Sequence, residues 1–167
     1  MSLFQADELI AALCRENVEF IVIGGVAATV HGLDRYTSDL DVIYRRTPDN
    51  IQRVAKAMDP LSPSLRGAPE GLPFRFDAET IVRGLNFTLM STAGPIDFFA
   101  TAPAATSYEE LVEHSVSIKL CGCDVLVVEL DKLIEMKRGA GRVKDFEMIA
   151  MLEELKNPLA DGGEPAS

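Results

Sequence analysis

The stretch from Phe20 to Tyr44 (FIVIGGVAATVHGLDRYTSDLDVIY) constrains the fold more than any other part of the chain. It begins with a short apolar run that ends in Gly24-Gly25, and small residues at helical spacing follow over 26–31. A polar loop then leads to Asp39-Leu40-Asp41, which lies inside a second apolar run. This order predicts a strand, a glycine turn, a helix, a loop and a strand that carries carboxylates.

The two aspartates of this second strand are expected to project from the same face. Side chains two positions apart on a strand point the same way, so Asp39 and Asp41 project together while Leu40 and Val42 point into the core. A pair of acids at this spacing is also common on the solvent face of a half-buried strand. The pair alone is therefore weak evidence for a metal site.

Asp97 is a third acid, and it lies between Ile96 and Phe98 in an otherwise apolar run. An aspartate is unfavourable in a strand and costly when it is buried without a partner. If this strand pairs beside that of Asp39 and Asp41, three carboxylates converge, and each raises the pKa of its neighbours. Hard divalent cations, Mg²⁺ above all, remove this conflict, and a pair of them can activate an attacking oxygen and stabilise a leaving pyrophosphate.

Residues before the acids are candidates for binding a triphosphate. Gly24-Gly25 permits a close approach of phosphate, and the start of the following helix offers free N–H groups. An ordinary tight turn is the alternative for these two glycines. Arg35 and Thr37 lie between the turn and the acids and could contact the triphosphate.

Positive charge is gathered in one short stretch near the C-terminus, in Lys132, Lys137, Arg138, Arg142 and Lys144, and Lys137 could bind the nucleotide phosphates. Lys137 follows an apolar helical stripe, which would aim its ammonium at the edge of the core. Asp145 shares a helical face with apolar residues and could hold Lys137 or Lys144, or position an acceptor. A solvated basic face explains any single member of the cluster equally well.

The other patterns predict the remaining elements. Helices are expected over 6–16, from Pro48 with Thr47 as cap until before Pro60, over 108–114, over 131–138 and over 143–155. Strands are expected over 18–23 and in two hairpins, 85–100 and 116–130. The segment 59–77 is rich in proline and glycine and is expected to form an irregular surface loop. Its Arg66 and Arg75 could reach a ligand, although solvated surface arginines are the commoner outcome.

Length and composition limit the class of protein. The 167 residues favour one domain, expected over 1–156, with a disordered tail over 157–167. No apolar run approaches the roughly 20 residues that span a bilayer, and the N-terminus lacks the features of a secretory signal. The three cysteines show no metal spacing and are expected to be reduced, which fits a cytoplasmic protein. The formal charge of −10 disfavours nucleic acid as a partner.

The combined pattern resembles the polymerase-beta-type nucleotidyltransferase superfamily, and within it the small bacterial abortive-infection and toxin–antitoxin-associated members. The resemblance covers roughly residues 18–152 and rests on Ile23-Gly24-Gly25, His31-Gly32, Arg35, Thr37, Asp39-Leu40-Asp41, Gly94-Pro95-Ile96-Asp97, and Lys137 followed by Gly141-Arg142-Val143-Lys144-Asp145. Gly25 departs from the pattern, since many active members carry serine there.

The resemblance implies a mixed β-sheet flanked by helices, two Mg²⁺ ions and transfer of a nucleoside monophosphate from a nucleoside triphosphate. Asp39, Asp41 and Asp97 would be the catalytic metal ligands. The nucleotide would be bound by the following residues: Gly24, Gly25, Arg35, Thr37, Lys137, Lys144 and Asp145. A partner protein in a toxin–antitoxin or phage-defence setting is the favoured acceptor, ahead of tRNA or an antibiotic.

Two other classes compete with this hypothesis. A catalytically inactive module that binds a partner protein is possible, but the presence of all three acids counts against it. A dinucleotide-binding oxidoreductase is disfavoured, because Gly24-Gly25 lacks the third glycine of that fingerprint and the acids follow too closely.

Overall fold

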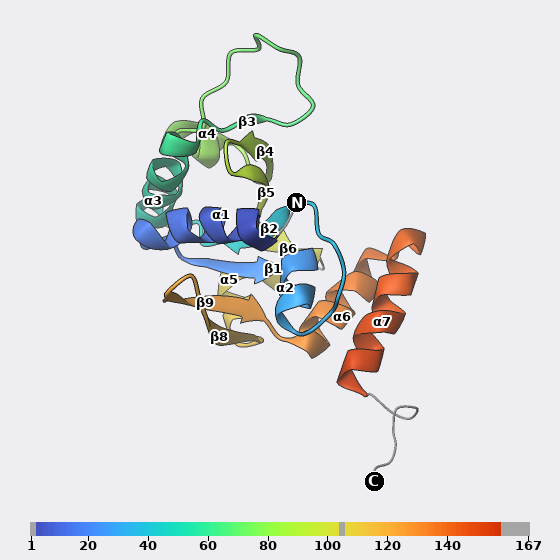
Figure 1. Ribbon diagram of the computed structural model, residues 1–167. Coiled ribbons are helices and arrows are strands. Elements are labelled where there is room, and N and C mark those ends of the chain that lie inside the picture. The colour runs from blue at the N-terminus through green and yellow to red at the C-terminus, as the bar shows by residue number, and fades with distance from the viewer. Residues whose placement is uncertain (1–2, 104–105, 158–167) are drawn as a thin grey trace.

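The computed structural model describes residues 3–103 and 106–157 (Figure 1). The predicted tail, apart from Asn157, lies outside the described residues. Within them, no helix is both long enough and apolar enough to cross a membrane.

A mixed seven-stranded sheet forms the centre of the fold, in the order β3-β4-β5-β2-β1-β9-β8. The β1–β9 and β2–β5 pairs are parallel, and the other neighbours are antiparallel. This architecture confirms the expected mixed sheet with flanking helices. The strands are β1 (Phe20–Ile23), β2 (Leu40–Tyr44), β3 (Ser64–Leu65), β4 (Phe87–Ser91), β5 (Gly94–Phe99), β8 (Ser115–Leu120) and β9 (Cys123–Val128), and β6 (Thr101–Ala102) pairs separately with β7 (Thr106–Ser107).

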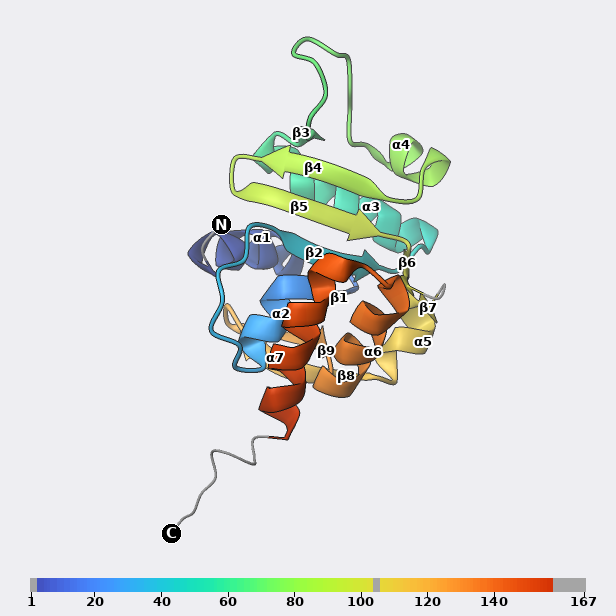
Figure 2. The same ribbon diagram turned by 90° about the vertical axis from the view of Figure 1, so that its right-hand side faces the viewer.

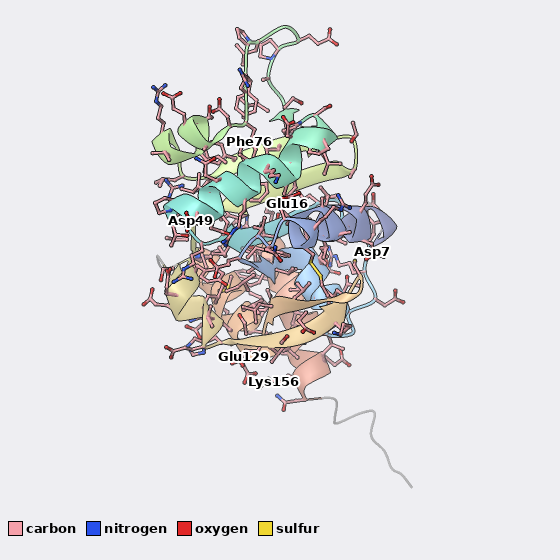
Figure 3. The ribbon with its side chains drawn as sticks, turned by 90° about the vertical axis from the view of Figure 1, so that its left-hand side faces the viewer. Asp7, Glu16, Asp49, Phe76, Glu129 and Lys156 are labelled. Atoms are coloured by element: carbon pink, nitrogen blue, oxygen red, sulfur yellow. A yellow bond between two sulfur atoms is a disulfide. The ribbon has the colours of Figure 1, made fainter. Side chains whose placement is uncertain are left out.

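Helices cover both faces of the sheet. On one face lie α2, α6 and α7, which stand in front of the strands in Figure 2, and on the other lie α1 and α3, which stand in front in Figure 3. The helices are α1 (Leu3–Arg15), α2 (Gly24–Val30), α3 (Pro48–Met58), α4 (Ala78–Arg83), α5 (Tyr108–Val112), α6 (Leu130–Ala140) and α7 (Phe146–Lys156), with short 3₁₀ turns η1 (Asp59–Leu61) and η3 (Val143–Asp145).

Local sequence signals explain several helix ends. Thr47 caps α3 by accepting a hydrogen bond from the backbone N–H of Asn50, as predicted. Ser107 and Glu110 form a reciprocal capping box at the start of α5. Gly141, at φ +64, ends α6 in the left-handed conformation that glycine adopts without strain.

The strands that lead to the site are fixed by their buried side chains. Leu40 and Val42 of β2 are fully buried, as the alternation predicted, and Tyr44 packs edge-to-face on Phe98 with ring centroids 5.9 Å apart. Each fully buried side chain of this size contributes about 1.5–3 kcal/mol to folding. A shift of β2 by one residue would put its aspartates into this core, so burial of the apolar face fixes the register.

Three expectations about elements differ from the structure. The segment 59–77 is not wholly irregular, because it contains η1 and the edge strand β3, whose two residues pair with β4. Gly139 does not interrupt α6, which continues to Ala140. Gly24 and Gly25 do not form a separate turn, since α2 begins at Gly24 itself.

The expectation of reduced cysteines is wrong for two of the three. Cys14 of α1 and Cys123 of β9 form a disulfide, drawn as the yellow bond in Figure 3, while Cys121 is free and exposed. The two bonded residues are 109 positions apart in the sequence. Spacing along the chain therefore gave no sign of the pair, which packing of α1 on the sheet brings together.

Candidate active site

The pairing of β2 with β5 brings the three predicted acids together. The two strands run parallel, with Asp41 directly beside Asp97. Asp39 precedes β2 and projects on the same side as Asp41, and ligand atoms of all three carboxylates lie within 4.8 Å of one another. The predicted convergence of the three acids is thus confirmed.

Burial and mutual repulsion shift the ionisation of this cluster. Desolvation, together with the charges of Asp39 and Asp97, raises the pKa of Asp41 to about 8. Burial also raises the pKa of Asp97, although the guanidinium of Arg66 opposes this shift. The metal-free cluster therefore retains a proton near neutral pH, and a bound cation would displace it.

The two glycines make room for side chains of the site. Gly24 has φ +69, and a Cβ there would lie 2.4 Å from Oδ2 of Asp41. A Cβ on Gly25 would lie 2.6 Å from Oγ1 of Thr37. Both distances are too short for real atoms, so glycine at each position lets the start of α2 press against the acidic strand and the loop before it.

Arg66 joins the cluster from the edge of the sheet. Its Nη2 donates a hydrogen bond to Oδ1 of Asp97 at 2.6 Å, and its Nη1 lies 3.6 Å from Oδ2 of Asp39. Surface solvation was the favoured expectation for this arginine. The strand β3 places Arg66 beside β4 and β5. Its two residues are too few to give a strand pattern in the sequence.

Lys137 and its neighbours form the opposite side of the site. Lys137 Nζ lies 3.6 Å from Oδ1 of Asp145, and its charge favours ionisation of Asp41. Asp145 is buried and also accepts a 2.7 Å hydrogen bond from Arg142. Burial opposes ionisation of Asp145, but the hydrogen bond from Arg142 and the charge of Lys137 outweigh it and lower its pKa. Asp145 therefore holds Lys137, one of the roles suggested for it.

A cavity of about 270 Å³ opens beside Asp41, between β5, β6 and α6. Gly24, Asp41, Lys137 and Arg142 supply its polar rim. The remaining lining is mostly apolar and consists of Ile23, Phe99, Thr101, Pro103, Leu133, Met136 and Ala140. Its polar rim next to an apolar wall suits a ligand with a charged end and an apolar ring.

Arg35 and Lys144 lie apart from this arrangement. Arg35 is exposed and contacts Met151 of α7, with Nη1 3.7 Å from the sulfur. Lys144 is exposed on η3. Neither lines the cavity within the part of the chain that the structure describes. Thr37 is placed differently, since its hydroxyl donates to the carbonyl of Asp39 at 3.3 Å, next to Gly25.

The residues present fit a hard divalent cation. The ligand set consists of carboxylate oxygens, which Mg²⁺ prefers. Oδ1 of Asp41 is buried and has no hydrogen-bond partner among the described residues, a costly state for a carboxylate oxygen that faces no cation. The arrangement can therefore concentrate positive charge beside the cavity once a cation is bound.

The solved structures that align with this chain include a candidate nucleotidyltransferase and an antibiotic-resistance factor. TM1012 of Thermotoga maritima, described as a candidate nucleotidyltransferase, aligns with a TM-score of 0.56 and 13% identity over 89% of each chain. The antibiotic-resistance factor ANT(2'')-Ia aligns in its solution structure with a TM-score of 0.59 and 12% identity, over 93% of this chain and 84% of that one. The crystal structure of ANT(2'')-Ia with adenylyl-2''-tobramycin aligns with a TM-score of 0.54 and 14% identity, over 89% of this chain and 88% of that one.

This chain has the nucleotidyltransferase fold. Comparison by sequence adds nothing further, since no family model and no curated protein matches the chain. At these identities the structural likeness concerns the fold alone.

Proposed function

We propose that this protein is a metal-dependent nucleotidyltransferase that moves a nucleoside monophosphate from a nucleoside triphosphate to an acceptor hydroxyl. The convergence of Asp39, Asp41 and Asp97 beside Gly24 is the observation that carries the proposal. These three acids come from two parallel strands and the loop before one of them, and Asp41 lines a cavity together with Lys137 and Arg142. Mg²⁺ bound by them would neutralise charge on the triphosphate and activate the acceptor oxygen.

Each side chain of the site has a separate role in the proposed reaction. Lys137 and the backbone at Gly24-Gly25 bind the β- and γ-phosphates, and Asp145 keeps Lys137 in place. The acceptor oxygen attacks the α-phosphorus, the bond from that phosphorus to the β-phosphate bridging oxygen breaks, and pyrophosphate leaves with the electron pair. Asp97 takes the proton of the acceptor hydroxyl, a role that its raised pKa suits. Positioning and charge neutralisation supply most of the catalysis.

The structure gives less support to nucleotide binding by Arg35, Thr37 and Lys144. Thr37 lies beside Gly25 and could donate its hydroxyl to a phosphate there. Arg35 and Lys144 remain proposals from sequence, because each would have to approach the nucleotide from an exposed position.

A partner protein in a toxin–antitoxin or phage-defence setting is our proposed acceptor. The resemblance in sequence supports it, and the charge of −10 disfavours a nucleic acid. The structure of ANT(2'')-Ia with adenylyl-2''-tobramycin supports the alternative of a small antibiotic acceptor. A cytoplasmic location stays part of the proposal, although disulfides such as Cys14–Cys123 are rare in that compartment.

Radiolabel transfer tests the proposed function. The protein is incubated with each α-labelled nucleoside triphosphate, Mg²⁺ and a host lysate, and then with purified antibiotics and tRNA. We expect label on one acceptor class, lost with Asp41→Asn and retained with Asp124→Asn, which removes an exposed acid of β9 paired to Lys119. Equal labelling by wild type and Asp41→Asn would refute the assignment.

A module that binds a partner without catalysis is the second candidate. The ion pairs of Arg66 with Asp39 and Asp97 favour it, because a permanent guanidinium in the cluster would replace the metal. Such a module would transfer no label to any acceptor, and it would bind its partner equally well when Asp41 is replaced by asparagine.

A further inference from the structure

Arg66 is fastened to the sheet at several points. Its backbone N–H donates to the carbonyl of Thr88 at 3.0 Å, which extends the pairing of β3 with β4. Its Nη2 donates to the carbonyl of Leu89 at 2.8 Å as well as to Asp97, whereas its buried Nε has no hydrogen-bond partner among the described residues. The guanidinium is thus held at the carboxylates by the β4–β5 hairpin instead of resting there as a free surface group.

The guanidinium pairs with two carboxylates of the cluster that a metal ion would need. Arg66 contacts Asp97 at 2.6 Å and Asp39 at 3.6 Å, and both are candidate ligands in the three-acid cluster. The side chains of Arg66 and Asp97 are 27% and 15% exposed, so water screens this charge pair only in part. Because a guanidinium and a metal ion beside the same carboxylates repel each other, the two cations compete for Asp39 and Asp97.

We propose that Arg66 is the built-in counter-ion of the carboxylate cluster and that a divalent cation binds by displacing it from Asp39 and weakening its bond to Asp97. The inference rests on the proposed function in one respect, since it takes the cluster to be a metal site. Arg66 is bound more strongly to the carboxylates in the metal-free protein than in the metal-bound protein. Because the two binding events are linked, this difference lowers the affinity of the cluster for metal by the same factor. Arg66 therefore keeps the cluster paired when no substrate is bound and holds the affinity for free metal low.

A titration with Mn²⁺ in the absence of nucleotide tests this competition without any measurement of activity. Arg66→Gln removes the charge, and we expect it to bind Mn²⁺ about fivefold to tenfold more tightly than the wild type, by isothermal titration calorimetry. Arg75→Gln is the matched control. It makes the same change of charge in the same segment, at a residue whose side chain is 87% exposed and lies 4.0 Å from Asp77. We expect its affinity to stay within about twofold of wild type.

A second variant covers the case in which Arg66→Gln does not fold. Arg66→Lys keeps the charge but lacks the planar fork of N–H donors with which the guanidinium contacts Asp39, Asp97 and the carbonyl of Leu89 together. We expect it to bind Mn²⁺ more tightly than the wild type does, though by less than the roughly fivefold to tenfold expected for Arg66→Gln. A merely structural role for Arg66 would weaken Mn²⁺ binding in both variants, so unchanged or weaker binding overturns the inference.

The same titration separates this inference from the proposed function. If wild type binds Mn²⁺ through Asp41 and Arg66→Gln binds no more tightly, the inference fails while the metal site stands. If only Arg66→Gln binds Mn²⁺, Arg66 is confirmed as the counter-ion, but it replaces the metal permanently and the proposed enzyme fails. If neither protein binds Mn²⁺, both are refuted.

Discussion

The backbone of Gly24 presses against the carboxylate of Asp41. A Cβ at residue 24 would lie 2.4 Å from Oδ2 and 3.1 Å from Cγ of Asp41, and the backbone there has φ +69. Ile23 pairs with Asp41 across β1 and β2, so the end of one strand fixes how far the glycine is from the acid on the other. A substitution at Gly24 thus acts on the acidic cluster directly.

Gly24→Ala is expected to damage both stability and activity. The left-handed backbone costs a residue with a side chain about 1–2 kcal/mol, and the new methyl must also push Asp41 aside. We expect nucleotide transfer to fall more than about tenfold, because the displaced carboxylate no longer meets its neighbours. Chemical denaturation and the transfer assay measure the two effects.

Gly139→Ala is the matched control for this substitution. Gly139 lies in α6, where an added Cβ meets nothing within 4 Å, and alanine is the better helix former. We expect unchanged activity and equal or slightly higher stability. If both glycine variants behaved alike, the contact of Gly24 with Asp41 would have no special importance.

The raised pKa of Asp41 predicts a specific pH dependence of stability. Folding moves the pKa of the Asp41 carboxyl from an ordinary 3.8 to about 8. Its contribution to the free energy of unfolding is therefore fully present below pH 3.8 and is lost as the pH rises to 8. Asp41→Asn has no such group. In EDTA, the melting temperature of wild type should therefore fall relative to that of Asp41→Asn between pH 5 and pH 8. A constant difference across this range would mean that the pKa of Asp41 is not raised.

The acids could be predicted from the sequence, while their basic partner could not. Strand alternation places Asp39 and Asp41 on one face, and an acid in an apolar strand singles out Asp97, so pairing of the two strands is sufficient to join them. Arg66 reaches the cluster through β3, whose two residues pair with β4 in a segment that its prolines mark as irregular. So short an edge strand forms only because β4 lies beside it, and the pattern of residues in the sequence does not indicate this pairing.

The disulfide was missed for a related reason, and it carries its own prediction. Cys14 and Cys123 meet only because α1 packs on the sheet, and closing this 109-residue separation stabilises the fold by about 2–5 kcal/mol. Denatured protein should show one reactive thiol per chain without reductant and three with it. Cys14→Ser should lower stability and Cys121→Ser should not. Three thiols in the unreduced protein would rule the disulfide out.

Lys137→Met is expected to weaken binding of the donor nucleotide. Lys137 lines the cavity beside Asp41, and its replacement removes the ammonium that we assign to the phosphates, while Asp145 keeps its hydrogen bond to Arg142. Calorimetry with a non-hydrolysable ATP analogue and Mg²⁺ should show about a tenfold loss of affinity. Lys119→Met, on the edge hairpin, should bind as wild type does. Equal affinities of both variants would remove Lys137 from the nucleotide site.

The contact between residues 25 and 37 predicts the effect of a serine at position 25, which the resemblance to nucleotidyltransferases would place there. A Cβ at residue 25 would lie 2.6 Å from Oγ1 and 3.1 Å from Cβ of Thr37, so the threonine occupies the space that a serine would need. Gly25→Ser alone should therefore lower both stability and transfer, even though it restores the familiar residue. Thr37→Ala alone should lower transfer, because it removes the hydroxyl beside Gly25, where we propose that the phosphates bind. The double variant Gly25→Ser/Thr37→Ala should recover much of the lost transfer, since one hydroxyl again lies beside residue 25 and only the 3.1 Å contact with the Cβ of residue 37 must relax. A double-variant cycle of transfer rates measures this coupling, and additive losses would show that the two positions act independently.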